Sequence, residues 1–325
     1  APELQRNAGW IFNGSTIESE RVNLCQNLSP FVTTASKGQT MMNPIPAATL
    51  RQAVTRDVAA SIAEDEGSGD RTAALIDPAR VVEAGVIVRH EAVVAGRPWV
   101  DECFRQVDPR LSVVWHCSEG ERVAADSHLL TITGPARSLL TAERIALNWL
   151  QTLSGVATRC RAYADLIAHT GARLLDTRKT LPGLRIAQKY AVGCGGCANH
   201  RIGLYDGILI KENHIASCGS ITAAVERARQ TSPDVPLEVE TETEAEVAEA
   251  IAAGAERIML DEFPLESMAR MVERYRGQAR FEASGGITEA NLAAIAETGV
   301  DFISLGVLTK DVTAVDLSLR IRDEA

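Results

Sequence analysis

Short apolar segments alternate with helical segments from residue 173 to residue 305, and this alternation restricts the possible folds more than any other feature of the chain. An apolar strand, a helix and a further apolar strand in succession are typical of parallel pairing with right-handed crossovers. The predicted strands are residues 173–176, 207–211, 237–240, 257–261, 279–284 and 302–305. The predicted helices between them include residues 221–230, 244–253, 265–276 and 289–297. We therefore expect the α/β class, with an incomplete (β/α) barrel that lacks two of the usual eight units.

The first half of the chain has a different pattern. A helix is predicted for residues 47–66, where apolar residues recur at helical spacing. Further strands are predicted at 85–90, 92–95, 111–117 and 129–133, and further helices at 99–107, 138–150 and 157–169. Strands mixed with helices in this way indicate an α+β sandwich. The expected divisions are an N-terminal extension (1–43, with a natural start at Met41 or Met42), a sandwich domain (44–155, joined by the tail 310–325) and the barrel (156–309).

Polar residues and glycines stand where the predicted barrel strands end. They are Asp176, Lys211, Glu240, Asp261, Ser284-Gly285-Gly286 and Gly306. In an α/β barrel the carboxyl ends of the strands share one face, and active sites are built on that face. Packing alone does not require a polar residue or a glycine at the end of each strand, so the pattern predicts an enzyme.

The same region concentrates cations in an acidic chain, which has 33 Lys and Arg against 43 Asp and Glu. Between residues 178 and 211 the cations are accompanied by one acid, Asp206, and they are Arg178, Lys179, Arg185, Lys189, Arg201 and Lys211. Fixed positive charge raises the local concentration of a small polyanion. A solvated basic surface is the alternative. Several of these cations closely follow apolar strands, which favours a pocket.

Composition restricts the partners and the compartment. A net charge of −10 argues against nucleic-acid binding, and no apolar run approaches the about 20 residues of a membrane-spanning helix. Seven irregularly spaced cysteines indicate a reduced, cytoplasmic interior. Cys194-Gly-Gly-Cys197 could bind zinc or cycle between thiol and disulfide, but the chain has no second pair with this spacing.

Several segments of the sequence resemble a known family. Residues 176–185 read DTRKTLPGLR, residues 194–196 CGG, residues 198–201 ANHR and residues 209–214 LIKENH. Further similar segments are 69–72, 134–137, 141–148, 153–156, 259–261 and 299–304. From about residue 57 to residue 319, the chain resembles the quinolinate phosphoribosyltransferases.

The resemblance implies a type II phosphoribosyltransferase-like fold, an incomplete α/β barrel beside an α/β sandwich. It implies transfer of the phosphoribosyl group of phosphoribosyl pyrophosphate to quinolinate with decarboxylation. The products would be nicotinate mononucleotide, carbon dioxide and pyrophosphate, within NAD biosynthesis. It also implies Mg²⁺ as cofactor and a homo-oligomer, either a dimer or a hexamer.

Quinolinate carries two adjacent carboxylates, and the planar fork of Arg binds a carboxylate through two hydrogen bonds. By resemblance its site is lined by Arg178, His200, Arg201 and Lys211, with Arg144 donated by the neighbouring subunit. Without the resemblance, Arg144 reads as an ordinary arginine on a helix surface. The positive charge of Arg201 lowers the expected pKa of His200, so we expect that ring to be neutral.

The second substrate reacts through an oxocarbenium-like transition state. Carboxylates stabilise its positive charge, and Mg²⁺ neutralises the leaving pyrophosphate. By resemblance Glu240 and Asp261 bind the ribose hydroxyls and the magnesium–pyrophosphate group, and Glu238 alternates onto the same side of the strand as Glu240. Backbone N–H groups of the glycine turns Ser284-Gly285-Gly286 and Gly306 can hold the 5′-phosphate.

Some assignments stay open at the level of sequence. Lys179 is expected to contact pyrophosphate or the reacting carboxylate, and either Lys179 or Lys211 could protonate the carbanion left by decarboxylation. Lys211 at a strand end would also suit a Schiff-base aldolase. A nicotinate-specific phosphoribosyltransferase and a non-catalytic anion-binding barrel are further alternatives. Glu262 departs from the family pattern, where Asn is common, and we expect a minor effect on magnesium or ribose contacts.

Overall fold

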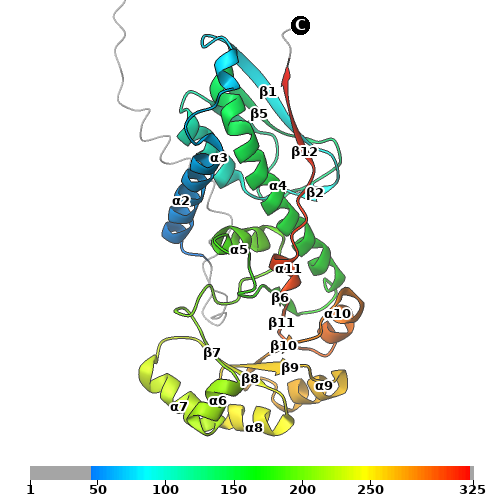
Figure 1. Cartoon of the computed structure of the whole chain (residues 1–325). Helices are drawn as coiled ribbons and strands as arrows, with labels where there is room; N and C mark the ends of the chain where they lie inside the picture. Colours follow the sequence, from blue (N-terminus) through cyan, green and yellow to red (C-terminus); the bar gives the residue numbers. More distant parts are fainter. Residues whose placement is uncertain (1–44, 323–325) are drawn as a thin grey trace, which may run out of the picture.

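The computed structural model describes residues 45–322, so the expected extension 1–43 lies outside it. The described chain has an antiparallel sheet at one end and a parallel sheet at the other (Figure 1). None of the helices within residues 45–322 is long and apolar enough to cross a membrane. The predicted α/β class, with an α+β sandwich beside an incomplete barrel, is confirmed.

The antiparallel sheet has the strand order β12-β1-β5-β3. Its strands are β1 (Val81–Val88), β3 (Ser112–Trp115), β5 (His128–Pro135) and β12 (Leu317–Arg322). A separate pair is formed by β2 (Ala92–Val93) and β4 (Arg122–Val123). Around them lie α2 (Ala47–Glu66), the short η2 (Ala73–Leu75), α3 (Arg97–Val107) and α4 (Ala136–Leu166). Because β12 pairs antiparallel with β1, the C-terminal tail is part of this first sheet.

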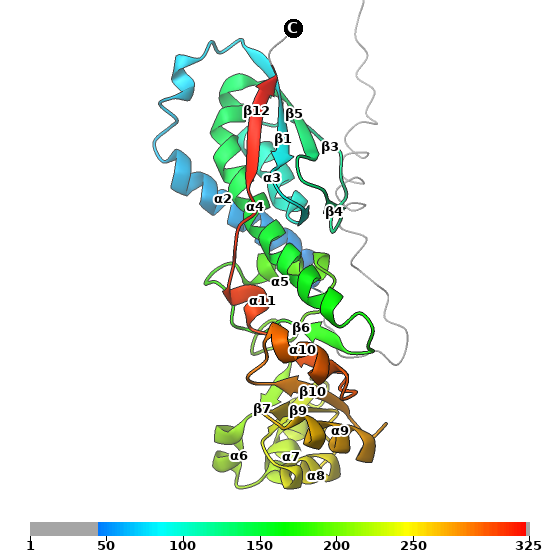
Figure 2. The same cartoon turned by 90° about the vertical axis from the view of Figure 1, so that its right-hand side faces the viewer.

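The helix α4 differs from the sequence-based expectation. Two helices were predicted, over residues 138–150 and 157–169, whereas the structure has one helix from Ala136 to Leu166. It runs from the first sheet to the barrel (Figure 2). The prediction was wrong because Ser154-Gly155 resembles a break. Gly155 instead allows a close contact, since a Cβ there would lie 2.0 Å from the carbonyl oxygen of Thr313 in the C-terminal tail.

We expect Gly155→Ala to lower the free energy of unfolding by about 2 kcal/mol, because overpacking costs about 1–3 kcal/mol and outweighs the helix propensity of Ala. Gly193 is the matched control. It lies in α5 (Arg185–Cys194), and apart from its chain neighbours and the adjacent helix backbone no atom of the described residues comes within 4 Å of the place that its Cβ would take. Gly193→Ala should therefore stabilise the protein by about 0.5–1 kcal/mol. Urea unfolding of both variants measures the difference, and equal shifts would contradict the close contact at Gly155.

The second part of the molecule is a six-stranded parallel sheet with the order β6-β11-β10-β9-β8-β7. Its strands are β6 (Arg173–Leu175), β7 (Ile208–Ile210), β8 (Leu237–Thr241), β9 (Arg257–Asp261), β10 (Arg280–Ser284) and β11 (Phe302–Ser304). The first strand, β6, lies beside the last, β11, as in a closed barrel. β6 and β7 are the two edges of the described sheet, so the barrel is open at a seam between them.

Helices follow the barrel strands: α5, then α6 (Glu212–Cys218), α7 (Ile221–Thr231), α8 (Glu244–Ala252), α9 (Leu265–Arg274), α10 (Glu289–Ala296) and α11 (Val307–Lys310). Short polar side chains cap the N-termini of several of these helices. Ser220 accepts a hydrogen bond from Ala223 N at the start of α7, and Thr243 and Glu246 form a capping box at the start of α8. Each such cap stabilises a helix by about 1 kcal/mol. Glu246 therefore stabilises the start of the helix.

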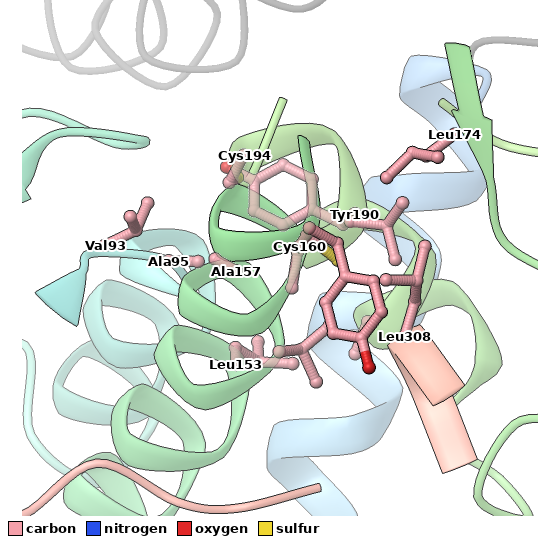
Figure 3. Close-up of a cluster of buried hydrophobic side chains, with 14 of the residues drawn as sticks. Val93, Ala95, Leu153, Ala157, Cys160, Leu174, Tyr190, Cys194 and Leu308 are labelled. Atoms are coloured by element: carbon pink, nitrogen blue, oxygen red, sulfur yellow. The ribbon is translucent and has the colours of Figure 1, made fainter. Parts of the chain in front are cut away.

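The core is continuous between the two parts. Trp99 of α3 stacks on Trp149 of α4, with ring centroids 5.8 Å apart, and lies 5.3 Å from the ring of Tyr190 on α5. Figure 3 shows Tyr190 in a cluster with apolar side chains of α4, among them Leu153. The aromatic contacts thus join the sandwich helices to the first helix of the barrel.

The cysteines of the CxxC pair belong to this core. Cys194 is buried and Cys197 half-buried, and both are free thiols. Burial raises the pKa of Cys194 well above its usual range, and the Sγ of Cys197 donates to the carbonyl of Cys160 at 3.4 Å. A buried thiol with a raised pKa is unreactive, which argues against the zinc or redox alternative.

Candidate active site

Neighbouring strands place polar side chains at one edge of the barrel. Lys211 follows β7, Glu240 lies near the end of β8, and Asp261 and Ser284 end β9 and β10. Strands β7 to β10 are adjacent, and Asp261 is the register partner of Ser284. Parallel strands bring their carboxyl ends to the same edge, so these four side chains share one face.

Lys211 and Glu240 form an ion pair on this face. The side chain of Lys211 is 42% exposed, and that of Glu240 is 10% exposed. Burial raises the pKa of Glu240, Lys211 opposes the shift, and the charge of Asp261 adds to it. Glu240 and Asp261 lie on the adjacent strands β8 and β9, where Glu240 is the register partner of Met259, two residues before Asp261. An ammonium held by a carboxylate has no free lone pair for imine formation, which weakens the aldolase interpretation.

The loop after β6 carries Arg178 and Lys179, both exposed. The backbone of Lys179 is held at both ends, since its N–H donates to Thr177 Oγ1 at 3.0 Å and its carbonyl accepts from Thr309 at 2.8 Å. The side chain of Lys179 passes over Gly306, where a Cβ would lie 3.0 Å from Lys179 Cδ. The structure therefore brings Lys179 and the Gly306 turn together.

Two cations of the predicted cluster serve the protein itself. Arg185 donates to Thr180 Oγ1 at 3.1 Å and to the carbonyl of Ile202 at 3.3 Å. Lys189 is fully buried in an ion pair with Asp176. Burial lowers the pKa of Lys189 and raises that of Asp176, and each partner opposes the shift of the other. Including Lys189 in an anion-binding cluster was wrong, because its ammonium is inaccessible to a ligand.

Arg201 is half-buried and lies in the segment that leads into β7. Its Nη1 donates to the carbonyl of Gly207 at 3.0 Å. Burial lowers the pKa of Arg201, and the charge of Arg178 is the next largest cause. The positive charges of Arg178 and Arg201 oppose each other, so binding of an anionic ligand to both would offset their repulsion.

His200 turns both ring nitrogens toward the protein. Nδ1 accepts the backbone N–H of Arg201 at 2.7 Å, and Nε2 lies 2.9 Å from Glu238 and 3.6 Å from Glu282. Burial is the main cause that lowers the pKa of His200, with contributions from Arg257 and Lys189. The sequence correctly predicted that the pKa of His200 is lowered. The predicted cause, the charge of Arg201, is not among the causes found in the structure.

Sequence reasoning missed two charged residues in the barrel interior, Arg257 and Glu282. The guanidinium Nη1 of Arg257 donates to Glu282 at 3.1 Å, and both side chains are buried. Burial raises the pKa values of Glu238 and Glu282 to about 7. Charged residues at alternate positions of β8, β9 and β10 were the available signal, because alternate residues of a barrel strand face inward.

His200, Glu238 and Glu282 have the composition of a metal site, with one possible ligand atom each within 4.8 Å of the others. The tautomer argues against a bound ion. Since Nδ1 accepts a backbone N–H, the proton of the neutral ring is on Nε2, the nitrogen that faces both carboxylates. A protonated nitrogen is not a metal ligand. We therefore interpret the group as an internal polar cluster that fills the barrel.

The glycine turn after β10 packs against the acidic end of β9. Gly285 and Gly286 have positive φ angles of 81° and 60°. A Cβ at Gly285 would lie 2.4 Å from Glu262 Cγ and 3.0 Å from Asp261 Oδ1. Glu262 itself has a φ of 55°, a left-handed conformation that Asn tolerates better than Glu. An Asn at this position, as the resemblance implies for the family, would thus have a backbone cause, and contacts to magnesium or ribose are not needed to explain it.

Arg144 is exposed on the first half of α4. This half of the helix packs against the antiparallel sheet, at the opposite end of the molecule from β7 and β8 (Figure 2). Within one chain, the structure does not bring Arg144 to the strand-end residues.

Comparison with known proteins identifies the family. Residues 70–154 match the N-terminal domain, and residues 156–320 the C-terminal domain, of quinolinate phosphoribosyl transferase. A probable nicotinate-nucleotide pyrophosphorylase (carboxylating) of Bacillus subtilis is 42% identical over 259 residues, covering 79% of this chain and 90% of the relative. A quinolinate phosphoribosyltransferase (decarboxylating) of Nicotiana glauca is 37% identical over 285 residues and 81% of each chain. The nicotinate-nucleotide pyrophosphorylase structure from Francisella tularensis superposes with a TM-score of 0.82 at 44% identity, covering 84% of this chain and 97% of the other. With both domains matched in order and relatives covered over most of their length, the chain belongs to the quinolinate phosphoribosyltransferase family.

Proposed function

We propose that the chain transfers the phosphoribosyl group of phosphoribosyl pyrophosphate to the ring nitrogen of quinolinate and releases the carboxyl group at carbon 2. The product would be nicotinate mononucleotide, an intermediate of NAD biosynthesis. The observation that carries the proposal is the strand-end face on which Lys211 pairs with Glu240 and Asp261 stands on the next strand. Arg178 lies in the loop after β6, and Arg201 lies in the segment that leads into β7. The face therefore offers cations that can bind a dicarboxylate and carboxylates that can stabilise a cationic sugar in the transition state.

Quinolinate binding would use Arg178, Arg201 and Lys211. The forked guanidinium groups bind the two carboxylates, and Lys211 adds an ammonium that is partly exposed at the same face. His200 contributes indirectly in this geometry, because its Nδ1 accepts the N–H of Arg201. The ring therefore supports the residue that contacts the substrate.

Phosphoribosyl pyrophosphate would lie along the ends of β8 to β11. Glu240 and Asp261 stabilise the positive charge that develops at the anomeric carbon. The turns at Gly285 and Gly306 offer backbone N–H groups for the 5′-phosphate, and Lys179 over Gly306 supplies a further cation for phosphate or pyrophosphate.

Magnesium fits the oxygen ligands of this face. Mg²⁺ is usually bound by one or two carboxylates together with substrate phosphates, and Glu240 and Asp261 are two such carboxylates on adjacent strands. When bound, Mg²⁺ would neutralise charge on the leaving pyrophosphate. A Glu240 carboxylate that holds Mg²⁺ would no longer pair with Lys211. The Lys211 ammonium would then be available to a quinolinate carboxylate.

Decarboxylation follows from the transfer. Once the ring nitrogen is bonded to ribose it is positively charged, so the electron pair left at carbon 2 is stabilised as an ylide. The step needs no organic cofactor. Lys179 and Lys211 are the ammonium groups that could return a proton to that carbon.

The direct test supplies purified protein with quinolinate, phosphoribosyl pyrophosphate and Mg²⁺. We expect carbon dioxide and pyrophosphate in equal amounts, and neither product when nicotinate replaces quinolinate. Activity with nicotinate alone would indicate the nicotinate-specific enzyme instead. Binding of quinolinate without turnover would indicate an anion-binding protein.

We further propose an oligomer, a dimer or a hexamer, in which Arg144 of one subunit completes the site of another. Arg144→Ala should abolish turnover without unfolding the protein, because the exposed side chain contributes little to packing. Mixing Arg144→Ala subunits with Lys211→Ala subunits should restore activity, since some hybrid sites then contain both residues. Subunit exchange is verified with labelled chains. If exchange occurs and activity does not return, the shared site is refuted.

A further inference from the structure

Residues 198–207 cross the open seam between β6 and β7. The N–H of Ala198 donates to the carbonyl of Leu174 at 2.8 Å, and the N–H of Asp176 donates to the carbonyl of Ala198 at 3.1 Å. The segment thus starts along the free edge of β6. Arg201 then reaches the carbonyl of Gly207, directly before β7. His200 and Arg201 therefore lie between the two edge strands.

A buried ion pair holds both backbone polar groups of His200. Asp176 Oδ1 accepts the N–H of His200 at 2.9 Å, and Lys189 Nζ donates to the carbonyl of His200 at 3.0 Å. The side chains of Asp176 and Lys189 are 0% exposed and bonded to each other. Asn199 completes the group by donating to Asp176 Oδ2 at 2.7 Å and to the carbonyl of Lys189 at 2.8 Å. These bonds set the orientation of the peptide group that joins His200 to Arg201.

Stability alone does not explain this group. Removing two charges from water costs about as much as their attraction returns, so a buried ion pair is a weak source of stability. Its directional bonds instead fix the backbone of His200, directly before Arg201. Without them the peptide group between His200 and Arg201 would be free to rotate, and the direction of the Arg201 side chain would no longer be fixed.

We propose that Asp176, Lys189 and Asn199 are positioning residues for the dicarboxylate substrate, because they hold the seam segment so that Arg201 faces the substrate carboxylate. The identity of that substrate rests on the proposed function. Asp176 and Lys189 are fully buried, so they act through the seam segment, and the Asn199 side chain donates to these same two residues. They act on quinolinate affinity and leave the phosphoribosyl pyrophosphate contacts on β8 to β11 in place.

The double variant Asp176→Asn/Lys189→Met tests this inference. It removes both buried charges together, so that neither charge is left unpaired. The asparagine introduced at position 176 can still accept the N–H of His200. The carbonyl of His200 loses its donor. We expect the KM for quinolinate to rise about 10- to 100-fold, as for a small misplacement of a binding group. The KM for phosphoribosyl pyrophosphate should change less than about twofold. Hydrogen exchange should accelerate in residues 198–203.

Arg229→Gln/Glu256→Gln is the control, because it neutralises an ion pair at the amino ends of β8 and β9, away from the strand ends that form the proposed site. It should leave both KM values unchanged. If the double variant does not fold, Asn199→Ala removes two of the bonds and keeps the ion pair, and a rise of about threefold or more in the quinolinate KM is expected.

Two results would overturn the inference: a folded variant with the wild-type quinolinate KM, or an equal rise of both KM values. A wild-type protein that does not turn over quinolinate would refute the proposed function instead. Hydrogen exchange would then decide the inference by itself, since unchanged exchange in residues 198–203 shows that the ion pair does not hold the segment.

Discussion

Glu240→Gln is expected to lower kcat by about 100- to 1,000-fold, the usual cost of removing one electrostatic stabiliser of a transition state. The substitution keeps the size of the side chain and removes its charge. That charge has two roles in the proposed mechanism: it stabilises the cationic sugar, and it is one of two carboxylates available to Mg²⁺. In the ligand-free protein it also holds Lys211. Steady-state kinetics with both substrates measures the loss.

The control for this prediction is Glu242→Gln. Glu242 is two residues further along the chain and exposed, so its charge lies outside the site and kcat should stay at the wild-type value. An equal loss in both variants would show that the loss of one negative charge lowers kcat wherever it occurs, and that the position of Glu240 is not special.

The pH profile gives an independent check on Glu240. Burial raises the pKa of this carboxyl group, and the proposed mechanism needs the ionised form. Activity should therefore rise with pH as Glu240 loses its proton, and fall as pH drops through a pKa above the ordinary value of a glutamate. This acid limb should be missing in the Glu240→Gln variant. An unchanged acid limb would assign the titration to another group.

Arg201→Lys is expected to raise the KM for quinolinate by about 10- to 100-fold, because a hydrogen bond to a charged group is worth about 1.5–3 kcal/mol. Lysine preserves the positive charge but loses the planar fork that binds a carboxylate through two bonds. It also loses the bond that Arg201 makes with the carbonyl of Gly207 across the seam. The KM for phosphoribosyl pyrophosphate should remain close to its wild-type value.

Arg227→Lys is the matched control for Arg201→Lys. Arg227 is exposed on α7, and the same chemical change there should leave both KM values unaltered. A quinolinate KM that stays at the wild-type value in Arg201→Lys would mean that charge alone, without the fork, is sufficient for binding.

Many elements of both parts of the fold could be predicted because their sequences carry local signals. The strand of residues 257–261 was predicted with its observed ends, and the helix of residues 47–66 likewise. Both are continuous in the local pattern of apolar residues. The helix α4 could not be predicted in one piece, because the reason for Gly155 lies in a tail segment about half the chain away in sequence.

Some features of the candidate site could likewise be predicted from local sequence, and others could not. Strand-end positions of Lys211, Glu240 and Asp261 followed from periodicity, since parallel strands end at one edge. The partners of Lys189 and His200 did not follow. Each pairs with a residue more than ten positions away, and nothing local to Lys189 distinguishes a buried cation from an exposed one.

The sequence by itself determined the fold class, the family and the barrel face that is proposed as the active site, because these depend on periodicity and on short motifs. Only the tertiary structure decided which charges are accessible to a ligand and which pair with each other. Arg178 and Lys179 are exposed at the site, whereas Lys189 is closed inside an ion pair with Asp176. The physical reason is desolvation: the cost of burying a charge and the partner that offsets it depend on the three-dimensional surroundings, which residue type and spacing do not specify.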